Sequence, residues 1–170
     1  MNDVKSVAVR QAGPGDLALL KRLRLASLAD APDAFLTTLA GEEAMTDAAW
    51  QERLDSNVAG ERTKGFFALV DGEAQGLVVG VRRPDRADSV NLNALWVAPA
   101  ARGRGTGRAL VDAVAAWARE CGCRRVTLAV IETNADATAL YRACGFEETT
   151  RVTRDDPDRP RTEVGMALEL

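Results

Sequence analysis

Residues 97–110 read VAPAARGRGTGRAL, and this stretch joins a predicted strand to a predicted helix. It carries three arginines and three glycines without a carboxylate, in a chain whose formal net charge is −3. Glycines let the backbone turn tightly and approach a ligand, and the first N–H groups of a helix lack internal acceptors at its positive dipole end. The stretch therefore predicts a binding site for a small oxyanion such as a phosphate. A solvated glycine turn with incidental arginines is the simpler alternative, and the loop alone leaves it open.

Alternating and apolar segments on either side of this loop predict an α+β fold. Strands are expected at 6–12, 66–70, 76–81, 89–97, 124–131, 146–153 and 163–170. Helices are expected to begin near residues 16, 46, 106 and 134, with an irregular segment at 33–45 between the first two. Neither an internal repeat nor a linker interrupts this order, so we expect residues 1–170 to form one domain.

Two local patterns add detail to this prediction. Asp71-Gly72 lies between two apolar runs and predicts a tight β-hairpin turn. In the strand at 89–97, a period of two places four apolar side chains on one face: Val90, Leu92, Ala94 and Trp96. We therefore expect this strand to present one continuous apolar face up to the glycine loop.

The composition excludes several classes of function. The chain has no histidine, so Ser-His-Asp and Cys-His catalysis are excluded, and acid–base chemistry falls to carboxylates, a tyrosine, a lysine, a cysteine or water. The three cysteines, Cys121, Cys123 and Cys144, predict neither a disulfide framework nor a zinc site, and we expect no metal. The net negative charge argues against nucleic-acid binding. No apolar run approaches the roughly 20 residues of a membrane span and no signal peptide is evident, so we expect a cytoplasmic protein.

Both common nucleotide motifs fail on spacing, because no Gly-Lys-Ser/Thr occurs and Arg108 stands where a dinucleotide fingerprint needs its third glycine. The loop does contain Arg102-x-x-Gly105-x-Gly107, which resembles the R/Q-x-x-G-x-G/A signature of the GNAT family of N-acetyltransferases. Leu95-x-Val97-x-Pro99 before the loop resembles the family's L-x-V-x-P strand end. NADATALYRACGF at 134–146 resembles its N-x-x-A-x-x-x-Y-x-x-x-G-F helix. The resemblance covers nearly the whole chain and implies an α/β/α sandwich, with a mixed, mostly antiparallel sheet of about seven strands and about four helices.

The resemblance also implies that acetyl-coenzyme A is the co-substrate and that the loop amides bind its pyrophosphate. A backbone N–H at a bulge in the preceding strand, near Val97, would bind the thioester oxygen, with Trp96 and Val97 along the pantetheine arm. The residues expected to bind the cofactor are Trp96, Val97, Arg102, Gly103, Arg104, Gly105, Thr106, Gly107, Arg108 and Asn134.

Asn134 and Tyr141 lie seven residues apart and therefore share one helix face. On structural grounds alone they are a helix cap and a half-buried aromatic. The resemblance implies that Asn134 contacts the pantetheine and that Tyr141 places its hydroxyl near the thioester sulfur. A thiol has a pKa near ~8.5 and a free tyrosine one near ~10, so a hydrogen bond from Tyr141 that strengthens as the thiolate forms would assist its departure.

The base that deprotonates the amine is less well defined by the sequence. Many family members carry a glutamate on the strand before the loop, whereas this chain offers Asn91 and Asn93 there. Glu132, at the end of the next strand, is the nearest alternative, although it fits an exposed strand end equally well. Water relayed by Asn91 or Asn93, or capture of the neutral amine, stays open.

The resemblance places the acceptor near 33–45 and 154–161. Phe35 and Leu36 could form an apolar wall there, and Glu42 and Glu43 could attract a cationic amine, unless the segment is only a solvated connection. We expect an N-acetyltransferase in which a small-molecule primary amine attacks acetyl-coenzyme A directly in a ternary complex. The alternatives are a protein N-terminal or lysine acetyltransferase and a non-catalytic coenzyme A-binding module. Family members often dimerise, so a homodimer is possible.

Overall fold

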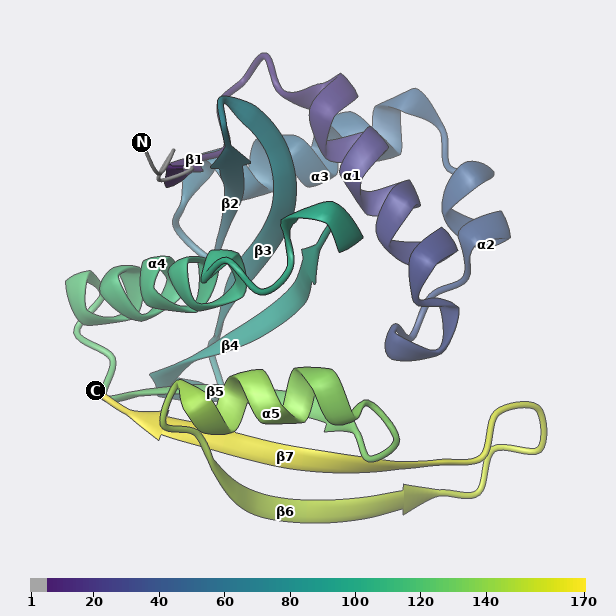
Figure 1. The fold of residues 1–170 in the computed structure, drawn as a ribbon, viewed down its shortest axis with the longest axis vertical. Helices are drawn as coiled ribbons and strands as arrows, with labels where there is room; N and C mark the ends of the chain where they lie inside the picture. Colours follow the sequence, from purple (N-terminus) through teal and green to yellow (C-terminus); the bar gives the residue numbers. More distant parts are fainter. Residues whose placement is uncertain (1–5) are drawn as a thin grey trace, which may run out of the picture.

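A single seven-stranded sheet forms the centre of the protein, in a computed structural model that describes residues 6–170 (Figure 1). Its strands lie in the order β1-β2-β3-β4-β5-β7-β6. They are β1 Val7–Gln11, β2 Thr63–Val70, β3 Glu73–Arg83, β4 Arg86–Val97, β5 Arg125–Ile131, β6 Glu147–Arg154 and β7 Arg161–Glu169. Only β4 and β5 pair in parallel. The predicted mixed, mostly antiparallel sheet is therefore confirmed.

Five α-helices accompany the sheet, one more than the sequence predicts. They are α1 Leu17–Asp30, α2 Leu39–Glu43, α3 Asp47–Ala59, α4 Thr106–Glu120 and α5 Ala135–Ala143, with 3-10 turns η1 at Pro32–Ala34 and η2 at Pro99–Ala101. The additional helix, α2, lies inside the segment expected to be irregular. Thr38 caps it by accepting a hydrogen bond from the Gly41 N–H at 3.1 Å. Among residues 6–170, no helix has the length and apolar character needed to cross a membrane.

The helices cover both faces of the sheet, which confirms the α/β/α sandwich (Figure 1). The core on one face joins α4 and α5 to the sheet through residues such as Leu110, Trp117 and Tyr141. The core on the other face joins α1 and α3 to the sheet and contains Leu23 and Trp50. Because each side of the sheet buries its own apolar cluster, the sheet is fixed from both sides and can hold a site at its centre.

A β-bulge interrupts β4 at Ala94. Opposite β3, Val79 pairs with Asn93 and Leu77 pairs with Trp96, so β4 carries one extra residue, and Ala94 has a φ of 55°. The bulge reverses the alternation: Leu92 packs into the α4–α5 core, whereas Trp96 packs into the α1–α3 core. The predicted single apolar face is therefore wrong beyond Leu92, and the bulge lies three residues before the position near Val97 implied by the family resemblance.

β4 and β5 separate shortly after they begin to pair. Their parallel ladder includes only Ser89–Asn91 on β4 and Arg125–Thr127 on β5, although both strands continue for several residues. Beyond the ladder the two strands diverge, as the ribbon shows (Figure 1). β4 and β5 are therefore not hydrogen-bonded to each other next to the bulge at Ala94, and we call this unpaired stretch the opening between the two strands.

Candidate active site

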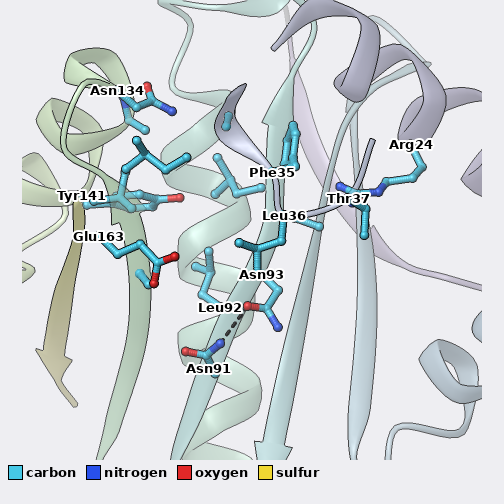
Figure 2. Close-up of a pocket in the computed structure, with 17 residues that line it drawn as sticks. Arg24, Phe35, Leu36, Thr37, Asn91, Leu92, Asn93, Asn134, Tyr141 and Glu163 are labelled. Atoms are coloured by element: carbon cyan, nitrogen blue, oxygen red, sulfur yellow. Dashed lines mark hydrogen bonds between the residues drawn. The ribbon is translucent and has the colours of Figure 1, made fainter. Parts of the chain in front are cut away.

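A pocket of about 370 Å³ occupies the opening between β4 and β5 (Figure 2). The three strands around it contribute residues 91–95 of β4, residues 129–131 of β5 and Glu163 of β7. Helix α5 and its cap contribute Asn134, Ala137 and Tyr141. The α1–α2 side contributes Arg24 and residues 34–37. The structure thus gathers Phe35, Asn91, Asn93, Asn134 and Tyr141, all predicted from the sequence as site residues. The sequence interpretation missed Ala94, Leu95 and Glu163.

The pocket connects the two faces of the sheet. Tyr141 approaches it from the α4–α5 side. Leu92 and Val164 also face that side, and because side chains alternate along a strand, Asn93 and Glu163 face the opposite side. A ligand bound along α5 and a ligand bound beside Glu163 can therefore meet in the opening of the sheet.

Tyr141 is 7% exposed, and its ring packs against Phe146 with the ring centroids 5.6 Å apart. Burial raises the pKa of Tyr141 to about 12. Figure 2 shows its hydroxyl directed into the pocket. The phenol therefore stays protonated over the physiological range and can donate a hydrogen bond to an atom bound there.

Asn134 forms the N-cap of α5. Its Oδ1 accepts a hydrogen bond from the Ala137 N–H at 3.2 Å, so its side-chain NH₂ remains available on the pocket side (Figure 2). Capping fixes the side chain, because the same hydrogen bond stabilises the first turn of the helix. Ala137, one turn before Tyr141, leaves room for a ligand to pass between the two.

The glycine loop leads from η2 into α4. Gly103 and Gly105 have φ values of 71° and 80°, and a Cβ added to either would have no atom within 4 Å. The buried Thr106 hydroxyl donates to the Ala101 carbonyl at 2.9 Å and fastens the loop to η2. The N–H groups that begin α4 have no acceptor within the helix, so the loop presents unpaired donors beside open space. This arrangement fits a phosphate-bearing cofactor.

The three arginines of the loop differ in their surroundings. Arg102 forms an ion pair with Asp30 and donates from Nε to the Val97 carbonyl at 3.0 Å. Arg108 donates to the Ala143 carbonyl at the end of α5. Arg104 is exposed, and within residues 6–170 its side chain has no polar partner. Two of the three arginines predicted to bind the cofactor therefore already hold the loop to α1 and α5.

Gly107 also lies at a close contact between α4 and α5. A Cβ on Gly107 would stand 2.8 Å from Cδ2 of Leu140, which belongs to α5. A larger residue at this position would therefore require the Leu140 side chain to shift. The expected role of Gly107 in cofactor binding stays a prediction, and its packing role is separate from it.

The side chains of Trp96 and Val97 do not line the pocket, and their expected place along a pantetheine arm stays a prediction. Trp96 packs into the α1–α3 core and donates from Nε1 to Oδ2 of Asp30 at 2.9 Å. Val97 packs into the opposite core. The bulge explains this placement, because it turns Trp96 to the other side of the sheet and gives Ala94 and Leu95 the positions on the pocket.

Asp30 joins α1 to β4 and to the glycine loop, and we expect Asp30→Asn to destabilise the protein in a pH-dependent way. The hydrogen bond from Trp96, followed by that from Arg102, lowers the pKa of Asp30. The pKa of Asp30 is thus lower in the folded state than in the unfolded state, where it is near ~3.9. The ionised side chain therefore stabilises the fold at pH values above ~3.9. This stabilisation is lost as the pH falls through the pKa of the folded state.

Urea unfolding should show Asp30→Asn less stable by about 1 kcal/mol at neutral pH, because the charged hydrogen bond is partly exposed. The difference should shrink once the pH falls below about 4. A difference that stays constant down to the acid unfolding transition would show that the charge of Asp30 is not what stabilises the fold.

Glu132 is not among the residues that line the pocket. It forms an ion pair with Arg151 on the exposed side of β6. The role of Glu132 as a base stays an untested prediction that this position does not favour. Instead, Glu163, which opposes Ile131 in the β5–β7 ladder, brings a carboxylate to the pocket. The alternating pattern of the last strand could have indicated which face of the sheet Glu163 occupies. It could not have indicated that β7 lies next to β5.

The α1–α2 side forms the outer wall of the pocket. Phe35 lies under the Arg24 guanidinium, 4.7 Å from its Cζ to the ring centroid, and Leu36 is 74% exposed. Glu42, expected to attract an amine, is 3% exposed and pairs with Arg24 at 2.9 Å and Arg53 at 2.8 Å. That expectation is wrong for Glu42, whose carboxylate instead anchors α2 to α1 and α3.

Comparison with known proteins places this geometry in a family. Residues 26–146 match the acetyltransferase (GNAT) family. The aminoglycoside N(6′)-acetyltransferase type 1 of Stenotrophomonas maltophilia is 34% identical over 151 residues, which cover 85% of this chain and 88% of that protein. The L-2,4-diaminobutyric acid acetyltransferase of Nocardia farcinica is 31% identical over 87 residues, or 51% of this chain and 45% of that protein.

Solved structures share the whole fold. The acetyltransferase of the GNAT family from Streptococcus pneumoniae has a TM-score of 0.80 at 22% identity, covering 97% of this chain and 100% of that one. The spermidine N-acetyltransferase of Vibrio cholerae, solved with CoA and spermine, has a TM-score of 0.78 at 17% identity, covering 96% and 95%. The chain therefore belongs to the GNAT family and is an acetyl-coenzyme A-dependent N-acetyltransferase.

Proposed function

We propose that the protein acetylates a primary amine of a small molecule, which attacks acetyl-coenzyme A directly in a ternary complex. The observation that carries this proposal is a contact between the two segments that border the acceptor side of the pocket. Arg159, in the β6–β7 hairpin loop, donates from Nη2 to the Pro32 carbonyl of η1 at 2.9 Å. The same Nη2 lies 3.7 Å from Oδ1 of Asp33. The two segments beside the pocket are thus joined, which favours a compact molecule over an extended peptide. The relatives named for aminoglycoside and diaminobutyric acid acetylation support the same class.

The residues that would hold the cofactor form a continuous path. The diphosphate would lie on the N–H groups of the glycine loop, near Arg104, and the pantetheine would run between β4 and α5 past Asn134. The backbone donor freed by the bulge near Ala94 would face the thioester oxygen, as an oxyanion hole requires. The cofactor supplies the acetyl group in activated form, as a thioester.

Tyr141 would assist the leaving group by hydrogen bonding. With a pKa of about 12 for Tyr141, against about 8.5 for a thiol, full proton transfer is uphill by roughly 3.5 units, or about 5 kcal/mol. A hydrogen bond from the neutral phenol to the developing thiolate avoids this cost, because the proton stays on oxygen. The acceptor attacks as the neutral amine: the C–N bond forms, the C–S bond breaks, coenzyme A leaves as a thiolate that accepts the Tyr141 hydrogen bond, and the proton lost from nitrogen passes to water.

The function is tested by release of free thiol from acetyl-coenzyme A in the presence of amines. We expect turnover with at least one of three small acceptors: an aminoglycoside bearing a 6′-amine, 2,4-diaminobutyrate and spermidine. Peptides with a free N-terminus or a lysine should be at least about 10-fold poorer by kcat/KM, which corresponds to about 1.4 kcal/mol of discrimination. Turnover of peptides alone would favour a protein acetyltransferase, and binding of coenzyme A without any thiol release would favour a non-catalytic module.

A further inference from the structure

Glu163 is the carboxylate that the fold presents to the acceptor. Among the described residues that line the pocket, only Arg24 and Glu163 are charged. Arg24 is balanced by Glu42: its Nε and Nη2 donate to that carboxylate, Nη2 also donates to the Thr37 hydroxyl, and Nη1 alone has no partner among the described residues. Glu163 is therefore the acidic side chain of the pocket, and it shares its charge with two neighbouring arginines.

Two arginines hold the Glu163 side chain in place. Arg161 donates from Nε to Oε1 at 2.9 Å, and Arg154 donates from Nε to Oε2 at 3.4 Å. The Glu163 side chain is 17% exposed. An ionised carboxylate has about four acceptor positions, so two donors leave capacity for more. The Arg154 side chain is 56% exposed, so solvent and salt screen its charge from a ligand in the pocket.

The position of Glu163 matches that of an incoming amine. It faces the same side of the sheet as Asn91 and Asn93, whose side chains form a hydrogen bond of 2.7 Å. Tyr141 reaches the pocket from the opposite side. Figure 2 shows the Tyr141 hydroxyl and the Glu163 carboxylate entering the same space from α5 and β7. An ammonium held by Glu163 would therefore face a thioester held beside Tyr141 through the opening in the sheet.

We propose that Glu163 is the substrate-binding carboxylate: it accepts hydrogen bonds from the acceptor's ammonium group and places that nitrogen at the opening between β4 and β5. This inference rests on the proposed small-amine function and names the residue that recognises the amine. It also replaces Glu132, which lies outside the pocket, as the acidic residue of the site. One carboxylate selects for an acceptor whose amine is cationic when it binds, and that amine loses a proton to water before it attacks the thioester.

Glu163→Gln keeps the shape of the side chain and removes its charge, so it isolates the proposed role. With 2,4-diaminobutyrate or the aminoglycoside as probe, we expect KM for the amine to rise at least about 10-fold, the loss expected for a charge-assisted hydrogen bond. The dissociation constant of acetyl-coenzyme A should not change. Calorimetric titration of the amine into the coenzyme A-loaded protein should show the same weakening without any turnover. Glu163→Asp, which keeps the charge, should recover part of the affinity.

Glu169→Gln is the matched control, because Glu169 lies on the same strand and near Arg125 but 75% exposed and away from the pocket. It should leave KM unchanged. Glu163→Gln with the wild-type KM and amine affinity would overturn the proposal, as would a rise in KM for Glu132→Gln instead. A wild-type protein that acetylates none of the amines would overturn the proposed function itself, which is a distinguishable result.

Discussion

Tyr141→Phe should lower kcat about 100-fold or more while leaving the affinity for acetyl-coenzyme A unchanged, because hydrogen-bond donors aimed at developing charge contribute on this scale. Phenylalanine keeps the ring that packs 5.6 Å from Phe146, so only the hydroxyl is lost. Tyr141 is the one tyrosine of the chain, which also makes its titration directly observable by ultraviolet absorbance.

The pH dependence separates a donor from a titrating acid. Burial raises the pKa of Tyr141 to about 12, so the phenol is protonated throughout the range in which the protein can be assayed. We therefore expect wild type and Tyr141→Phe to have pH–rate profiles of the same shape, differing only in height. A wild-type profile with a descending limb near ~10 that disappears in Tyr141→Phe would mean that Tyr141 titrates as an ordinary tyrosine. An unchanged kcat would reduce Tyr141 to a packing residue.

Gly105→Val should weaken the binding of acetyl-coenzyme A about 100-fold. Gly105 has a φ of 80°, a conformation that costs a residue with a side chain roughly 1–2 kcal/mol and a β-branched one more. The loop should relax to another conformation and move the N–H groups at the start of α4. Losing two charge-assisted hydrogen bonds to a diphosphate, at about 1.5 kcal/mol each, gives roughly 3 kcal/mol, or about 100-fold.

The control for this variant is Gly72→Val. Gly72 has a φ of 84° in the β2–β3 turn, and a Cβ there also has no atom within 4 Å. Both variants should therefore lose similar stability in urea unfolding, but only Gly105→Val should lose affinity in calorimetry. Equal affinities for the two variants would mean that the glycine loop does not bind the diphosphate. Gly107→Val is less informative, because its clash with the Leu140 side chain would change the packing between α4 and α5 as well as the loop.

The predictable part of this molecule is the part governed by local pattern. The strand at 89–97, the glycine loop and the helix after it follow from alternation, glycine spacing and apolar periodicity, and the structure has β4, the loop and α4 there. The turn at Asp71-Gly72 was predictable for the same reason, since both residues adopt positive φ in a two-residue hairpin. Family motifs then located Asn134 and Tyr141 on one helix face.

What the sequence did not reveal depends on contacts between distant residues. α2 is held by the buried Glu42, whose partners Arg24 and Arg53 belong to two other helices. The bulge in β4 is marked by an alanine, a residue that gives no signal for a positive φ. Glu163 reaches the pocket because β7 inserts between β5 and β6, a strand order that no local pattern encodes. Glu132 follows the strand after the glycine loop, whereas Glu163 lies much later in the chain. Nearness in the sequence therefore pointed to Glu132 as the acidic residue of the site.

A crystal structure of the protein with acetyl-coenzyme A tests the central claim most directly. The account predicts the diphosphate within hydrogen-bond distance of the backbone N–H groups at 103–108, with the thioester between the Tyr141 hydroxyl and the bulge at Ala94. A diphosphate bound anywhere else, or a thioester remote from the opening between β4 and β5, would contradict it.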